Sequence, residues 1–199
     1  FLFSMGSGLV QLLIRNGYLK SDPIIRAFNE ITRADFVPPE FEEQAEADIP
    51  LPIGFGQAIS QPTTVAIMFE LLSPRPGQKM LDIGSGSGWT SALLGHIAGS
   101  GGKVAALEVL PELYEVTKRN VEKFGLMSAG IVECILGDGH LGYASLAPYD
   151  RILVSAAADE IPQALKDQLT LGGKMVIPIH NHLTYLEKRG ENDFYKEEF

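Results

Sequence analysis

The chain has 199 residues, a length that suits one domain with one hydrophobic core. Apolar residues make up 45% and charged residues 21%, a composition that excludes a fully disordered chain. The 16 Lys and Arg are outnumbered by 25 Asp and Glu, and the resulting net charge of −9 disfavours nucleic acids as partners. A single cysteine, Cys134, excludes an internal disulfide and a cysteine-rich zinc site.

No apolar run reaches the ~20 residues that a membrane-spanning helix needs, so no membrane partner is expected. Residues 1–4 are too short for a signal peptide and lack its charged flank, and we interpret them as a remnant of the start of the chain. The single cysteine suits a reducing compartment. These features predict a cytoplasmic protein, which we expect to be a monomer.

The N-terminal part, about residues 8–72, is predicted to hold three helices, over residues 9–16, 22–31 and 65–72. Asp22 is the expected N-cap of the second helix because a proline follows it. Between the last two helices, the proline-rich stretch 36–62 is predicted to be a long loop without regular structure. Since this loop is also rich in apolar residues, we expect it to be packed and functional.

From about residue 78 to residue 199, short apolar strands alternate with helices. Strands are predicted over residues 79–83, 104–108, 131–136, 149–155 and 174–179, and helices over 89–98, 111–124 and 162–169. Such alternation is typical of a parallel sheet covered on both faces. Residues 183–189 and 194–199 flank a polar turn and are predicted to form an antiparallel hairpin. The predicted fold is a single α/β domain, three-layered and Rossmann-like, with a mostly parallel sheet, antiparallel C-terminal strands and added N-terminal helices.

The first predicted strand runs into a glycine-rich loop, Asp82-Ile83-Gly84-Ser85-Gly86-Ser87-Gly88, and then into a helix. Glycines in this context let the backbone approach a ligand closely. A nicotinamide-dinucleotide fingerprint would require glycine at position 89, where this chain has Trp89. The pattern resembles instead the nucleotide loop of class I S-adenosylmethionine-dependent methyltransferases.

Acidic residues end the next two strands. Glu108 lies twenty positions after Gly88, a spacing that suits a carboxylate binding ribose hydroxyls, and Asp138 stands between two glycines where it could accept from an adenine amino group. The carboxyl ends of neighbouring parallel strands meet at the edge where open α/β sheets bind ligands. Together these residues predict a nucleoside site. The alternative is that the glycines only turn the chain and the acids are solvated strand ends.

The fourth strand is followed by Ser155-Ala156-Ala157-Ala158, which contains no general base and no ring to stack on a base. This favours an acceptor that needs no deprotonation, and a carboxylate is already ionised at pH 7. Catalysis then reduces to holding a carboxylate oxygen in line with the methyl group and the sulfonium while water is excluded.

Longer motifs extend over almost the whole chain. They cover residues 33–38, 50–54, 56–62, 81–88, 137–139, 156–168 and 172–178. The most specific are Ile53-Gly54 and Ile59-Ser60-Gln61-Pro62. Through them the chain resembles the protein-L-isoaspartate (D-aspartate) O-methyltransferase family. The resemblance implies methyl transfer to the α-carboxylate of L-isoaspartyl and D-aspartyl residues in damaged peptides and proteins, and a seven-stranded sheet whose last strand is reversed.

The resemblance also implies roles for individual residues. Ser60 matches the active-site serine, which positions the acceptor carboxylate through its hydroxyl. The positions implied to contact S-adenosylmethionine are Gln61, Asp82, Gly84, Ser85, Gly86, Ser87, Glu108, Asp138 and Gly139. Those implied to shape the peptide groove are Ile53, Ala58, Ile59, Val176 and Pro178. No metal is expected, because His180 and His182, predicted on one strand face, have no third ligand at a suitable spacing.

The chain departs from the family pattern at Ala58, where threonine is common, and at Glu46, where an aromatic ring is common. It also ends before the family's usual final strand. Ser60 has a structural alternative as the N-cap of the following helix. Two other functions stay open: a methyltransferase for another carboxylate or small molecule, and a silent module that binds the cofactor without turnover.

Overall fold

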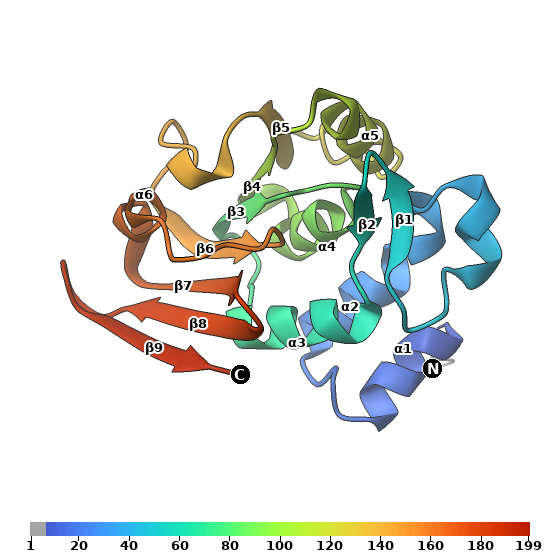
Figure 1. Ribbon diagram of the computed structural model, residues 1–199, viewed down its shortest axis with the longest axis horizontal. Coiled ribbons are helices and arrows are strands. Elements are labelled where there is room, and N and C mark those ends of the chain that lie inside the picture. The colour runs from blue at the N-terminus through green and yellow to red at the C-terminus, as the bar shows by residue number, and fades with distance from the viewer. Residues whose placement is uncertain (1–6) are drawn as a thin grey trace.

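A computed structural model describes residues 7–199, which form a seven-stranded sheet flanked by helices and a separate two-stranded hairpin (Figure 1). The strands of the main sheet are β3 (Lys79–Ile83), β4 (Lys103–Glu108), β5 (Val132–Leu136), β6 (Tyr149–Val154), β7 (Leu169–Ile179), β8 (His182–Lys188) and β9 (Phe194–Glu198). Their order across the sheet is β5-β4-β3-β6-β7-β8-β9. The predicted α/β fold is confirmed.

The first five strands of this sheet run parallel, β8 pairs antiparallel with β7, and β9 pairs antiparallel with β8. The predicted C-terminal hairpin is therefore present. However, the strand that runs against all the others is β8, and not the last strand as the resemblance implies. A two-residue turn at His180 and Asn181 joins β7 to β8, so His180 does not share a strand face with His182 as predicted.

The helices lie mainly on one face of the sheet. The α-helices are α1 (Gly8–Arg15), α2 (Asp22–Glu30), α3 (Pro62–Leu72), α4 (Trp89–Ala98), α5 (Pro111–Glu122) and α6 (Gln163–Asp167), and the short 3-10 helices are η1 (Arg33–Phe36), η2 (Pro39–Gln44), η3 (Gly99–Gly101) and η4 (Gly139–Leu141). Residues from α1 to α5 pack with one set of strand side chains into the larger core cluster. The smaller cluster on the other face is closed by Leu165 of α6 and by loop residues such as Tyr143 and Leu146. The second face is thus covered largely by loops.

The stretch 36–62 contains more regular structure than its prolines predict. Strands β1 (Leu51–Gly54) and β2 (Gln57–Ile59) form an antiparallel hairpin, which the sequence analysis missed. Pro52 is tolerated because a two-stranded ribbon leaves backbone groups unpaired on its outer edges. The tip turns through three consecutive residues with positive φ, Gly54, Phe55 and Gly56. The long loop is therefore a packed segment with a defined hairpin.

Helix α3 begins at Pro62, three residues before the predicted start, and two N-cap assignments differ by one residue from the structure. Ser21, and not Asp22, is the N-cap of α2, because Asp22 already lies within the helix. Gln61, and not Ser60, is the N-cap of α3. Within residues 7–199, no helix is long and apolar enough to cross a membrane. The interpretation of residues 1–4 lies outside the described residues.

Candidate active site

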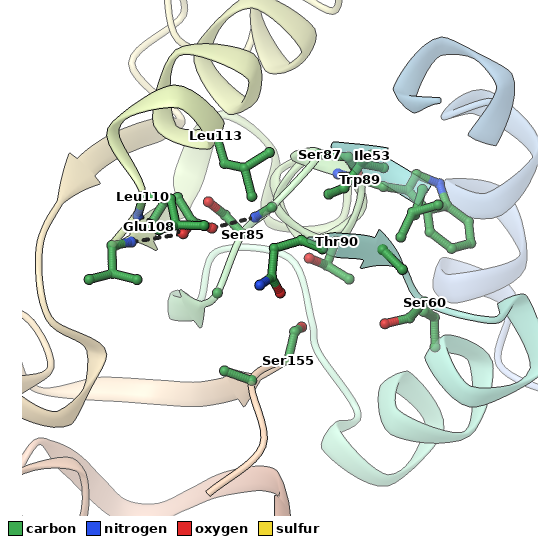
Figure 2. A pocket seen from close by; sticks show the side chains of 18 residues that line it. Ile53, Ser60, Ser85, Ser87, Trp89, Thr90, Glu108, Leu110, Leu113 and Ser155 are labelled. Atoms are coloured by element: carbon green, nitrogen blue, oxygen red, sulfur yellow. Dashed lines mark hydrogen bonds between the residues drawn. The ribbon is translucent and has the colours of Figure 1, made fainter. Parts of the chain in front are cut away.

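The carboxyl ends of β3, β4 and β6 form one wall of a cavity of about 310 Å³, and the β1–β2 hairpin with the residues after it forms the opposite wall (Figure 2). Predicted site residues that line it are Ile53, Ala58, Ile59, Ser60, Gly84, Ser85, Gly86, Ser87 and Glu108. The fold thus brings together residues that lie more than 50 positions apart in the sequence.

The glycine loop after β3 is shaped by its close neighbours. Gly84 and Gly86 have φ values of 77° and 53°. A Cβ atom on Gly84 would lie 3.3 Å from Ala156, and one on Gly86 would lie 3.3 Å from the Cδ1 atom of Ile53 in the hairpin. Because side chains there would be both strained and crowded, the loop presents bare backbone to the cavity.

Two polar side chains of α5 fix this loop from behind. Thr117 Oγ1 donates a hydrogen bond to the carbonyl of Gly86 at 2.9 Å and lies 3.0 Å from Ser85 Oγ. Asn120 Nδ2 donates to the carbonyl of Ser87 at 2.9 Å. Sequence analysis missed both residues. Their signal was available, since two polar residues three positions apart occupy the otherwise apolar face of an amphipathic helix.

Glu108 is held by three backbone N–H groups in the wall of the cavity (Figure 2). Its Oε2 accepts from the amide of Gly86 at 2.8 Å, and its Oε1 accepts from the amides of Val109 at 2.9 Å and Leu110 at 3.0 Å. A carboxylate offers about four lone-pair sites, so it retains capacity for a ligand hydroxyl. The carboxylate is pre-oriented and buried, as a ribose-binding group requires.

Asp82 does not reach the cavity. Its side chain is fully buried, and its Oδ2 accepts from Thr90 Oγ1 at 2.8 Å and from Ser91 Oγ at 2.5 Å. Its Oδ1 has no partner among residues 7–199. Burial raises its pKa to about 6, with the Glu108 charge adding to the rise and the two hydroxyl hydrogen bonds opposing it. Asp82 thus supports the first turn of α4 and does not line the cavity, and its contact with the cofactor stays a prediction.

A second cavity of about 300 Å³ adjoins the first and shares Gly84, Val109 and Ala156 with it. Its walls are largely apolar, and Asp138 and Gly139 lie on its border. The Asp138 carboxylate is exposed and accepts from the backbone amide of His140 at 2.9 Å, a hydrogen bond that lowers its pKa together with the His140 ring. Gly139 is sterically required, because a Cβ atom there would lie 2.3 Å from Ile83 Cγ2.

Ser60 lies on the hairpin side of the first cavity, and its hydroxyl points into the cavity (Figure 2). Within residues 7–199, this hydroxyl has no hydrogen-bond partner, whereas the Ser60 carbonyl accepts from Arg33 Nη2 at 3.1 Å. Since Gln61 caps α3, the structural alternative for Ser60 is wrong. Its hydroxyl is free to bind a ligand.

A single buried guanidinium holds this side of the cavity together. Arg33 is 4% exposed, and its Nη atoms donate to the carbonyls of Ala45, Ala47, Ile49 and Ser60 at 2.8 to 3.2 Å. Burial lowers its pKa to about 10, although the Asp48 charge opposes this shift. The guanidinium carbon also lies 5.5 Å from the centre of the Trp89 ring. Sequence analysis quoted Arg33 only as part of a motif, and its role was missed.

Besides Asp82, three predicted site residues lie outside both cavities. The Gln61 amide donates to the Asp48 carbonyl at 3.1 Å and to Asp48 Oδ2 at 3.3 Å, so it orders the start of α3 and does not face the cofactor side. Val176 is fully buried inside β7, and Pro178 follows it in the same strand. In residues 7–199, no three His, Cys, Asp or Glu side chains lie close enough together to hold a metal ion.

Comparisons with known proteins agree with this geometry. The family model described as protein-L-isoaspartate(D-aspartate) O-methyltransferase (PCMT) matches residues 5–197. A protein-L-isoaspartate O-methyltransferase of Aeropyrum pernix is 47% identical over 90% of this chain and 70% of its own, and one of Staphylothermus marinus is 44% identical over 94% and 86%.

Solved structures show the same fold. A protein-L-isoaspartate O-methyltransferase superposes with a TM-score of 0.85 at 29% identity, over 96% of this chain and 62% of that one, so the chain spans less than two thirds of that relative. A putative protein-L-isoaspartate O-methyltransferase from Plasmodium falciparum, solved with S-adenosyl-L-homocysteine, superposes with a TM-score of 0.82 at 23% identity, over 96% of this chain and 92% of that one. The chain belongs to the protein-L-isoaspartate(D-aspartate) O-methyltransferase family.

Proposed function

We propose that the protein is a repair methyltransferase that transfers the methyl group of S-adenosylmethionine to the α-carboxylate of L-isoaspartyl and D-aspartyl residues in peptides and proteins. One observation carries the proposal: the free Ser60 hydroxyl and the glycine loop with Glu108 line opposite walls of one cavity. Membership in the family supports it. We also propose that residues 1–199 form one methyltransferase domain.

The residues present fit the cofactor. Glu108 would accept hydrogen bonds from the ribose hydroxyls, and the bare backbone of Gly84 and Gly86 leaves room for the amino-acid end. The second cavity is lined largely by apolar residues, which suits a base, and Asp138 lies at its border to accept from an amino group. When bound, S-adenosylmethionine supplies an electrophilic methyl group on a positively charged sulfur.

The cavity wall also matches the chemistry of the acceptor. Of the described residues that line the first cavity, Glu108 alone is titratable, and three amides already hold its carboxylate. The site therefore offers no side chain suited to remove a proton from a neutral acceptor. A carboxylate needs no such removal at pH 7. The chain's own contribution is orientation by the Ser60 hydroxyl and exclusion of water by Ile53 and Ile59.

The experiment that tests the function uses paired peptides that differ only in an aspartyl or isoaspartyl linkage. With tritiated S-adenosylmethionine, base-labile label is expected on the isoaspartyl peptide and near background on the aspartyl peptide. Equal labelling would favour a methyltransferase for carboxylates in general. Absence of label on both, combined with calorimetric binding of S-adenosylhomocysteine, would favour the silent module. That the protein is a cytoplasmic monomer stays a prediction.

A further inference from the structure

A second hydroxyl lies in the first cavity at a position to which no role has been given. Ser155 follows β6 directly, is partly exposed, and lines the cavity together with Ser60. Figure 2 shows both hydroxyls directed into the cavity, from two segments that lie 95 positions apart in the chain. Sequence analysis noted only that this segment lacks a base.

The backbone on both sides of Ser155 is fixed against the cofactor loop. The Ser155 amide donates to the carbonyl of Ile83 at 2.8 Å, which continues the pairing between β6 and β3. The next residue, Ala156, lies close to Gly84: a Cβ atom added to Gly84 would be 3.3 Å from the Cβ atom of Ala156. The backbone that carries the Ser155 hydroxyl is therefore fixed directly beside the glycine loop.

The hydroxyls that line this cavity differ in what they already bind. Ser85 Oγ pairs with Thr117, Ser87 Oγ accepts from the Trp89 amide, and Thr90 Oγ1 donates to Asp82. Among residues 7–199, the hydroxyls of Ser60 and Ser155 have no partner. Both residues are partly exposed and line the same cavity, so a ligand that enters it can accept a hydrogen bond from each hydroxyl without breaking a contact of the fold.

We propose that Ser155 is a catalytic residue that binds the acceptor carboxylate together with Ser60. The inference rests on the proposed function. One hydrogen bond leaves a carboxylate free to rotate about its bond to carbon, whereas two donors from opposite sides fix its plane. Fixing the plane aims one oxygen lone pair along the line of attack, where orientation contributes most to the rate.

The step balances without proton transfer. A carboxylate oxygen forms a bond to the methyl carbon as the bond from sulfur to that carbon breaks, and the bonding pair stays on sulfur. The negative charge of the carboxylate and the positive charge of the sulfonium disappear together. Neutral hydroxyl donors suit this change, because a cationic side chain would favour the charged reactant and oppose its loss.

The test uses a matched pair of variants, Ser155→Thr and Ser155→Val, which have the same shape and differ by one hydroxyl. We expect the valine variant to lose about 10- to 100-fold in kcat/KM for the isoaspartyl peptide, and the threonine variant to stay within about threefold of the wild type. The exposed Ser145→Val serves as the control. The dissociation constant of S-adenosylhomocysteine should be the same in all four proteins.

Binding of the isoaspartyl peptide to the protein loaded with S-adenosylhomocysteine gives a readout without turnover, and valine should weaken it relative to threonine. Combining Ser155→Val with Ser60→Ala should cost less than the product of the single effects, since both hydroxyls hold one group. The proposal would be overturned if the threonine and valine variants had equal kcat/KM values. It would also be overturned if the loss of kcat/KM were fully explained by weaker binding of S-adenosylhomocysteine. Wild-type labelling of aspartyl and isoaspartyl peptides tests the proposed function separately.

Discussion

The two walls of the catalytic cavity are built by different means. On the cofactor side, Glu108 and the glycine loop stand at the ends of neighbouring strands. Backbone amides hold the Glu108 carboxylate, and Thr117 and Asn120 hold the loop. On the acceptor side, Ser60 follows a small hairpin, and the surrounding segments are joined mainly by the side chain of Arg33, with Asp48 binding the start of α3. The first wall is thus fixed mainly by sheet register, and the second mainly by the contacts of a buried cation. We therefore expect substitutions in the acceptor wall to reduce stability and turnover, and substitutions in the cofactor wall to reduce the affinity for the cofactor.

The largest effect is expected from Arg33→Ala, which attacks the acceptor wall. Four carbonyls would lose their donor, and we expect the free energy of unfolding to fall by about 3 to 5 kcal/mol. Urea denaturation measures this change. The exposed Arg26→Ala on α2 is the control, and equal stability of the two variants would contradict the role of Arg33.

If the alanine variant fails to fold, Arg33→Lys keeps the charge but cannot reach four carbonyls with one nitrogen. This variant should lose turnover with the isoaspartyl peptide while S-adenosylhomocysteine binds nearly as tightly as to the wild type. If turnover and the affinity for S-adenosylhomocysteine fell by the same factor, Arg33 would support both walls and not the acceptor wall alone.

The next effect concerns Asp82 beneath the cofactor wall and depends on pH. Its pKa in the fold is raised from 3.8 to about 6, so the fold favours the protonated form. Stability from this group is present below about pH 4 and is lost as pH rises through about 6. The shift corresponds to about 3 kcal/mol. Asp82→Asn should remove this pH dependence. Denaturation of the wild type and the variant at pH 4 and pH 7.5 measures it, and an equal change in the free energy of unfolding between the two pH values would contradict the assignment.

A smaller effect is expected for Glu108→Gln on the cofactor wall. The amide of glutamine would place N–H groups against backbone N–H groups and would weaken the ribose contact, which should reduce affinity for S-adenosylhomocysteine about 30-fold. Calorimetry measures this. Glu133→Gln on the neighbouring strand β5 is the control, and matching affinities in the two variants would exclude Glu108 from the site.

The smallest effect is expected for Asp138→Asn at the border of the second cavity. Because its carboxylate is exposed, water screens its interactions, and we expect S-adenosylhomocysteine to bind only about threefold more weakly. A loss as large as that of Glu108→Gln would show that the bound ligand buries this residue.

The sequence predicted the cofactor wall better than the acceptor wall. The strand ends and the glycine loop follow local patterns, and parallel pairing then brings Glu108 and Asp138 to one edge. The contacts of Arg33 join it to residues 12 to 27 positions away, which composition does not encode. The β1–β2 hairpin is local, but its prolines and glycines were interpreted as a loop. Ser60 was found only through the resemblance.

Two predicted site residues do not line either cavity, because strand residues alternate between faces. Asp82 pairs within β3 opposite Ala106 and Leu153, so its side chain points to the face that packs on α4, and not to the edge. Val176 pairs within β7 and is buried for the same reason. Asp82 and Val176 lie before the ends of their strands and pack beneath the cavity, whereas Glu108 is the last residue of β4 and lines it.

The close contact between Ala156 and Gly84 limits how this scaffold can change its chemistry. A side chain on residue 84 would meet the Cβ atom and the backbone nitrogen of Ala156, and the positive φ of Gly84 would strain it as well. Residue 84 can therefore leave glycine only if the segment after β6 moves away at the same time. The glycine loop and the segment that carries Ser155 are thus expected to change together during evolution, and not one at a time.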